Sequence, residues 1–132
     1  MQKDVKMLEA IQRRFTRLIA GMKNVPYEER LRKLHLQSLE CRRKKRDLVQ
    51  AFIIWTGVDK IEGLSFTKIS EQHNKNTRSA TKDNFVQPHS RLDQRKHFFA
   101  VRVVPEWNKL PLKLQRAVNV YSFKAQLKNH IF

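Results

Sequence analysis

The sequence predicts a mainly α-helical protein that begins with a small three-helix bundle. Apolar residues recur at three- and four-residue spacing through the first 57 residues, which is the period of amphipathic helices. Residues that start or stop helices, such as Ser38 and Gly57, bound these runs. The same spacing returns near the C-terminus at Phe123, Leu127 and Ile131. With 132 residues, the chain forms one domain or two small units sharing a core.

The first predicted helix ends near Gly21 and is amphipathic, with one apolar face and one basic face. Its apolar face consists of Val5, Leu8, Ile11, Phe15, Leu18, Ile19 and Met22. The opposite face is basic and consists of Lys3, Lys6, Arg13, Arg14 and Arg17. We expect the apolar face to be covered by the neighbouring helices.

Two further helices complete the predicted unit over residues 1–57. The second begins near Pro26, which suits a first helical turn, and buries Tyr27, Leu31 and Leu34. The third is capped by Ser38, reaches about residue 56 and stops at Gly57. Its apolar side consists of Cys41, Leu48, Val49, Phe52 and Trp55. Because about 57 residues bury only a marginal core, we expect this unit to rely on the rest of the chain.

A polar, flexible connector is predicted over residues 58–84 and an aromatic, basic segment over residues 85–132. The segment 85–87 precedes Pro88 and is a candidate short strand. Residues 98–108 combine strand-favouring valines with helical spacing, and Pro105 disfavours a helix interior. We favour a short helix ending near Asn108. Asn119 or Ser122 caps a terminal helix.

The charge balance indicates a polyanionic partner. Lys and Arg number 28 against 12 Asp and Glu, giving a net charge of +16, and a nucleic acid would neutralise such an excess. The lone Cys41 excludes an intrachain disulfide, favours a reducing compartment and is expected as a core thiol. No apolar run approaches the roughly 20 residues of a membrane span, so we expect no membrane partner and an intracellular protein of the nucleus or cytoplasm. The N-terminal helix could imitate a mitochondrial transit peptide, but Asp4 and Glu9 weaken this interpretation.

Seven arginines are candidates for contacts with nucleic acid. Arg13 and Arg17 lie one turn apart on the first helix, so they could reach successive phosphates. The third helix and the C-terminal segment contribute the remaining candidates, Arg42, Arg43, Arg46, Arg95 and Arg102. The alternative for each is an ordinary solvated helix face. Nearby aromatic residues could stack on unpaired bases but more often form a core, and these are Phe98, Phe99, Trp107 and Tyr121.

The sequence supplies no recognisable catalytic, metal or cofactor site. Its five histidines are scattered, at positions 35, 73, 89, 97 and 130, and no C-x-x-C or H-x-x-x-H spacing occurs. The aspartates stand alone, whereas two-metal catalysis requires converging carboxylates. With only three glycines, the chain also lacks a glycine-rich phosphate loop. We therefore expect a protein that is not an enzyme.

The segment RLDQRKHFFAVRVVPEWNKLP, Arg91 to Pro111, carries a specific resemblance. It resembles the end of the reverse transcriptases of non-LTR retrotransposons, the jockey-like group, where an R-x-x-F-F-x-x-R-V-V-x-x-W-N-x-L-P block precedes a short S-F-K helix. The matching residues are Arg95, Phe98, Phe99, Arg102, Val103, Val104, Trp107, Asn108, Leu110, Pro111, Ser122, Phe123 and Lys124. Residues 8–21 and 27–48 are similar to the family's thumb helix and to the segment that follows it.

The resemblance implies the thumb and C-terminal tail of an RNA-directed DNA polymerase. Family thumb helices pack along the template–primer duplex, which implies contacts to RNA, DNA or their hybrid for Arg13, Arg17, Arg43 and Arg46. The family's F/Y-A-D-D turn and metal-binding palm are not in this sequence. We therefore expect a non-enzymatic, nucleic-acid-binding fragment. The alternatives are a protein-interaction module that needs a missing palm partner, or a non-functional remnant of a transposable element.

Overall fold

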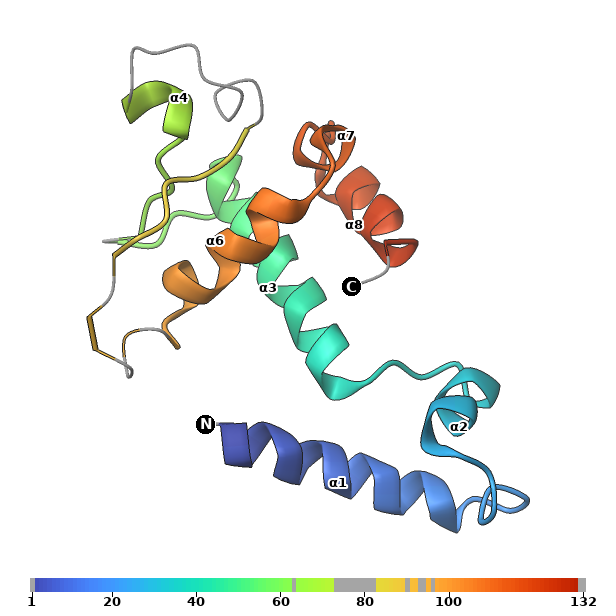
Figure 1. Ribbon diagram of the computed structural model, residues 1–132. Coiled ribbons are helices and arrows are strands. Elements are labelled where there is room, and N and C mark those ends of the chain that lie inside the picture. The colour runs from blue at the N-terminus through green and yellow to red at the C-terminus, as the bar shows by residue number, and fades with distance from the viewer. Residues whose placement is uncertain are drawn as a thin grey trace. The chain divides into compact units, whose positions relative to one another are not determined.

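The computed structural model describes residues 2–62, 64–72, 83–89, 91, 92, 95 and 97–130. The chain is mainly helical, which confirms the predicted fold class (Figure 1). The helices are α1 (Gln2–Leu18), α2 (Tyr27–Lys33), α3 (Leu39–Trp55), α4 (Ile69–Gln72), α6 (Phe99–Lys109), α7 (Leu112–Gln115) and α8 (Val120–Lys128). They divide into two compact units, Met1–Lys44 and Lys45–Phe132.

The boundary between the units falls inside α3, whereas the sequence pattern placed a boundary after residue 57. The packing of the C-terminal half of α3 explains the difference. Leu48, Ala51 and Phe52 belong to a core cluster that they form with α6, α7, α8 and Phe85. The apolar stripe of α3 is thus buried against the C-terminal segment, and not in the three-helix bundle that we predicted.

Local capping signals in the first unit match the sequence prediction. Gly21 has φ +76° and ends the turn after α1, a conformation that glycine adopts without steric cost. Ser38 Oγ accepts a hydrogen bond from Cys41 N at 3.2 Å, which caps α3. After α2, His35 takes a positive φ of 53° and Leu36 N donates to Leu31 O at 2.8 Å, the pattern of a Schellman motif.

Helix α1 is joined to the rest of its unit through polar groups. Glu9 accepts hydrogen bonds from Tyr27 Oη at 2.6 Å and from Leu39 N at 2.9 Å. Gln12 Nε2 donates to Gln37 O at 3.0 Å, and Thr16 is buried one turn later. The predicted apolar face points elsewhere and stays exposed, with Phe15 65% and Leu18 74% exposed. Our expectation that neighbouring helices cover this face was wrong, because a polar stripe makes the helix contacts.

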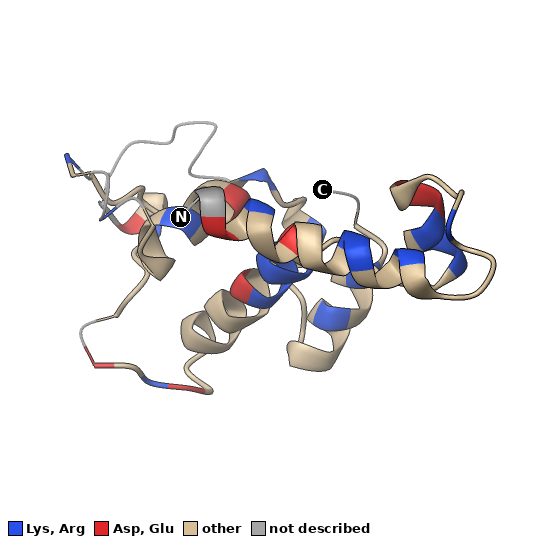
Figure 2. Ribbon diagram, turned by 90° about the horizontal axis from the view of Figure 1, so that it is seen from below, with Lys and Arg blue, Asp and Glu red and all other residues tan. Residues whose placement is uncertain are grey.

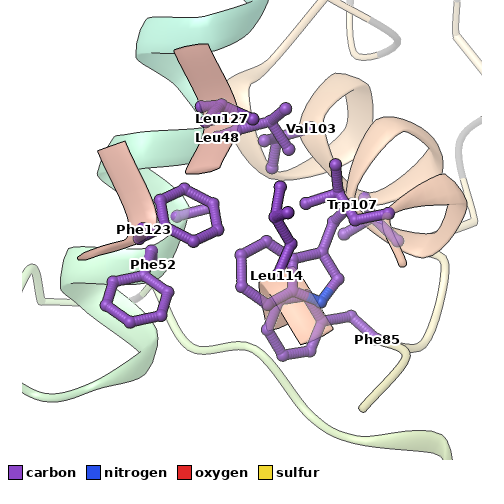
Figure 3. Packing of buried hydrophobic residues seen from close by; sticks show 11 residues of the cluster. Leu48, Phe52, Phe85, Val103, Trp107, Leu114, Phe123 and Leu127 are labelled. Carbon is purple, nitrogen blue, oxygen red and sulfur yellow. The ribbon is translucent and has the colours of Figure 1, made fainter. Parts of the chain in front are cut away.

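The core of the second unit is aromatic (Figure 3). Trp107 of α6 lies at its centre, fully buried, with its ring stacked on Phe85 at a centroid distance of 4.8 Å. Phe52 of α3 and Phe123 of α8 stack at 4.5 Å. Such ring pairs add stability beyond the burial of their area. This cluster therefore joins α3 to α8 through two rings, Phe52 and Phe123, that are 71 residues apart in sequence.

The described parts of the predicted connector contact this core. Phe66 stacks on Phe85 at 4.8 Å, and Lys68 forms an isolated antiparallel bridge with Phe85. Asn108 pairs with both backbone groups of Phe85, accepting from its N–H and donating to its carbonyl at 2.9 Å each. The predicted strand at 85–87 is thus reduced to one bridge. Residues 73–82 of the connector lie outside the described residues.

The ambiguous segment 98–108 is helical, as we favoured. Helix α6 contains Pro105 in its interior, so the hydrogen bond that a backbone N–H would make at this position is missing. The buried side of the helix is formed by Val103, Val104 and Trp107. Asn119 caps α8 by accepting from Ser122 N at 2.8 Å, which decides between the two predicted caps. No helix in the described part of the chain is both long and apolar enough to cross a membrane.

Candidate nucleic-acid interface

The central basic residues of α3 are exposed on the side of the helix that faces away from the core. Arg42, Arg43 and Arg46 are exposed, whereas Leu48 and Phe52 are buried. At 100° per residue, the three arginines fall within about 100° of one another. Arg43 and Arg46 lie opposite Leu48 and Phe52, whereas Arg42 lies at the flank of the helix, about 80° from Phe52. Within the described part of the chain, no carboxylate pairs with these three guanidinium groups. They form what we call the α3 arginine face.

The two lysines within the same run have internal partners. Lys44 forms an i,i+4 salt bridge with Glu40 at 3.0 Å, and Lys45 Nζ donates to Lys128 O at 3.2 Å. These lysines lie on the core side of the helix, where such partners are within reach. The helical period therefore divides the sequence run into arginines without a carboxylate partner among the described residues and lysines with a partner inside the chain.

On α1, Arg13 and Arg17 are exposed and one turn apart, as predicted. Arg13 also lies over the ring of Tyr27, with its guanidinium carbon 4.7 Å from the ring centroid. Arg13 remains exposed beside this cation–π contact. Lys and Arg recur along the ribbons of both units, interrupted by Asp and Glu (Figure 2).

Arg102 is committed to the interior of the second unit, and we remove it from the candidate set. Its Nε and Nη2 donate to the two carboxylate oxygens of Asp47 at 2.8 and 2.9 Å, and Nη1 donates to His97 O at 2.8 Å. The hydrogen bond to Asp47 raises the pKa of Arg102 above its ordinary value. Such a bidentate pair fixes α6 against α3. Arg95, by contrast, is exposed.

A second acidic residue binds two further cations of the C-terminal unit. Asp83 Oδ1 lies 2.8 Å from Lys68 Nζ, and Oδ2 lies 2.8 Å from Arg116 Nε. Burial raises the pKa of Asp83, but the hydrogen bonds and positive charges of Lys68 and Arg116 outweigh this effect, so the net pKa is lowered. The sequence offered no signal for this arrangement, because the three residues are far apart and lie in polar segments.

The four aromatic candidates separate into core and surface. Trp107 is fully buried and Phe99 packs against the core, as the core interpretation predicts. Phe98 and Tyr121 are 66% and 84% exposed. For these two rings, stacking on unpaired bases stays a hypothesis.

Cys41 is not the core thiol that we predicted. It is only partly buried, and its Sγ lies 3.9 Å from Gln37 Oε1. The buried part of α3 begins at Leu48, about two helical turns after Cys41. Among the described residues, no group of three or more His, Cys, Asp or Glu side chains is arranged to hold a metal ion.

Comparisons with known proteins give no independent identification. No protein-family model matches the chain, and neither curated proteins nor solved structures match it. The resemblance to retrotransposon reverse transcriptases therefore rests on the sequence motifs alone.

Proposed function

We propose that the chain is a non-enzymatic nucleic-acid-binding module, derived from the thumb and C-terminal tail of a non-LTR retrotransposon reverse transcriptase. The observation that carries the proposal is the α3 arginine face, on which Arg42, Arg43 and Arg46 are exposed without a carboxylate partner among the described residues. The ligand is RNA, DNA or an RNA–DNA hybrid, bound through its phosphates. An intracellular location in the nucleus or cytoplasm belongs to this proposal.

The geometry suits phosphate contacts because the arginines stand on one continuous helix, α3. Arg42 and Arg46 are one turn apart, which separates their Cα atoms by about 6 Å along the helix axis. Leu48 and Phe52, further along the same helix, are buried in the core of the second unit. Phosphate contacts of this kind give affinity but little sequence preference.

Binding to duplex DNA, hybrid and single-stranded RNA should depend steeply on salt. With about six phosphate contacts, affinity falls roughly a thousandfold between 50 and 200 mM salt. The triple variant Arg42→Ala, Arg43→Ala, Arg46→Ala should bind at least about tenfold more weakly at low salt, and its log–log salt slope should be smaller by roughly 3. A fluorescence anisotropy titration at several salt concentrations measures both quantities.

Two controls separate the α3 arginine face from net charge. The variant Lys60→Ala, Lys113→Ala, Lys124→Ala also removes three exposed cations, and it should lose much less affinity. Arg102→Gln removes one cation from an internal pair, so it should leave the salt slope unchanged while lowering the free energy of unfolding by about 1–2 kcal/mol. Equal losses for both triple variants would refute a localised interface.

The exposed apolar face of α1 favours a second candidate, a protein-interaction module that docks on a partner such as a polymerase palm. Its exposed members include Met7, Leu8, Ile11, Phe15 and Leu18, each 48–74% exposed. Contiguous apolar surface of this kind is uncommon on a monomer without a partner. The purified chain should then bind a hydrophobic dye or self-associate, and Phe15→Gln should reduce dye fluorescence. A monomer that binds no dye argues against this candidate.

A further inference from the structure

Arg30 of α2 is a buried cation that forms no ion pair with any residue in the described part of the chain. Arg30 is only 2% exposed. Its Nε and Nη1 atoms are inaccessible and have no hydrogen-bond partner among the residues that the structure describes. Guanidinium groups at such depth are normally paired, because an unpaired buried charge is strongly destabilising. An anion that contacted Arg30 would therefore stabilise the fold.

Among the described residues, no hydrogen bond or ion pair joins Arg30 to a carboxylate. Glu9, the acidic residue at the contact between α1 and α2, accepts from Tyr27 Oη at 2.6 Å and from Leu39 N at 2.9 Å. Burial, together with the hydrogen bond to Glu9, raises the pKa of Tyr27 to about 12, and the phenol therefore stays a neutral donor at physiological pH. Within the described ranges, the contacts of α2 with α1 thus give the Nε and Nη1 atoms of Arg30 no acceptor.

A second guanidinium lies against the same ring. Arg30 is 5.6 Å and Arg13 is 4.7 Å from the centroid of Tyr27, measured from each guanidinium carbon. Two cations close to one aromatic ring repel each other, and an oxyanion bound beside them would relieve that repulsion. Arg13 is exposed, so it can move to admit a ligand.

We propose that Arg30 and Arg13 form an oxyanion-binding site in the first unit, and that its ligand is a phosphate group. The phosphate is either a free ion or part of a nucleic-acid backbone, and Arg30 supplies a planar pair of N–H donors to it. Entry requires the Arg30 guanidinium to turn outward as Arg13 shifts, because Nε and Nη1 are covered in this structure. The site lies on α1 and α2 and does not depend on the α3 arginine face.

Thermal unfolding of the full chain in phosphate and in chloride at equal ionic strength tests the site. With a millimolar dissociation constant, about 20 mM inorganic phosphate should raise the unfolding midpoint by roughly 5 °C. Arg30→Met should lose most of this rise, and its midpoint in chloride should equal or exceed that of the wild type because an unpaired buried charge is removed. Arg32→Met is the matched control, since Arg32 is an exposed cation of the same helix, and it should keep the full rise.

Three results would overturn the proposal: no phosphate-specific rise, equal losses in Arg30→Met and Arg32→Met, or no response of the Arg30 Nε–H resonance when phosphate is added to the wild type. The resonance decides the question even if Arg30→Met does not fold. Repeating the titration with a short single-stranded oligonucleotide distinguishes a backbone phosphate from the free ion. The α3 triple variant should keep its phosphate response, so a failure here is distinct from a failure of the α3 interface.

Discussion

Trp107→Ala should lower the free energy of unfolding by about 3–5 kcal/mol, the largest stability change that we expect from one substitution in this chain. The indole is fully buried, and it stacks on Phe85 and Phe123 at centroid distances of 4.8 and 5.9 Å. Its removal leaves a cavity at the point where α3, α6 and α8 meet. Small domains are stable by only about 5–15 kcal/mol, so the variant will be close to unfolding at room temperature.

The hydrogen bond of the Trp107 indole contributes to this loss of stability, and its contribution can be measured separately. Trp107 Nε1 donates to the backbone carbonyl of Asp83 at 2.9 Å. Trp107→Phe keeps a ring in the core but leaves this carbonyl without its donor, and it should cost about 1–3 kcal/mol. Urea unfolding followed by circular dichroism measures both variants.

An exposed aromatic residue provides the control for Trp107. Tyr121 is 84% exposed, and Tyr121→Ala should change the free energy of unfolding by no more than about 0.5 kcal/mol. If the two alanine variants were equally stable, the aromatic cluster would not be the core of the second unit.

The features that could be predicted from the sequence depend on residues close together in the chain. The Ser38 and Asn119 caps each lie three residues before the N–H that they accept. The helical period along α3 also separated the arginines from Leu48 and Phe52. Such local signals predicted the helices and most of their ends.

The features that could not be predicted depend on which face of one helix packs against which other element of the fold. The apolar period of α1 is strong, yet Glu9 and Gln12 make its contacts and Phe15 is exposed. Periodicity shows that a helix has an apolar face, but it does not identify the partner of that face. The aromatic ring of Phe85 could not be assigned to the core for the same reason.

For the candidate site, too, the sequence could not show which residues are in contact in the fold. The sequence predicted where cations are abundant, but it could not show which ones have internal acidic partners. Arg102 pairs with Asp47 across 55 residues, whereas Arg46, one residue before Asp47, is exposed. Arg30 was not a candidate at all, because only the fold reveals that it is buried.

Asp83→Asn should be the most damaging substitution of a charged residue, with an expected cost of about 2–3 kcal/mol at neutral pH. Asp83 is 17% exposed and bridges Lys68, before α4, to Arg116, after α7. Neutralising it leaves the half-buried Lys68 without its counter-charge. Asp59→Asn is the matched control, since Asp59 is exposed and its carboxylate accepts a hydrogen bond from Gln50 at 3.2 Å, and it should cost less than about 0.5 kcal/mol.

The pH dependence of the unfolding free energy of Asp83→Asn tests whether the ion pairs of Asp83 cause the loss of stability. Because Lys68 and Arg116 lower the pKa of Asp83 below its ordinary value of 3.8, the folded state holds the carboxylate ionised where the unfolded chain takes up a proton. The contribution of Asp83 is therefore complete above the unfolded pKa and disappears as pH falls through the lower, folded pKa. The difference in unfolding free energy between wild type and Asp83→Asn should be constant between about pH 7 and pH 5 and should shrink below about pH 4. Urea titrations across this range measure it, and a difference that did not shrink in acid would mean that the ion pairs are not its source.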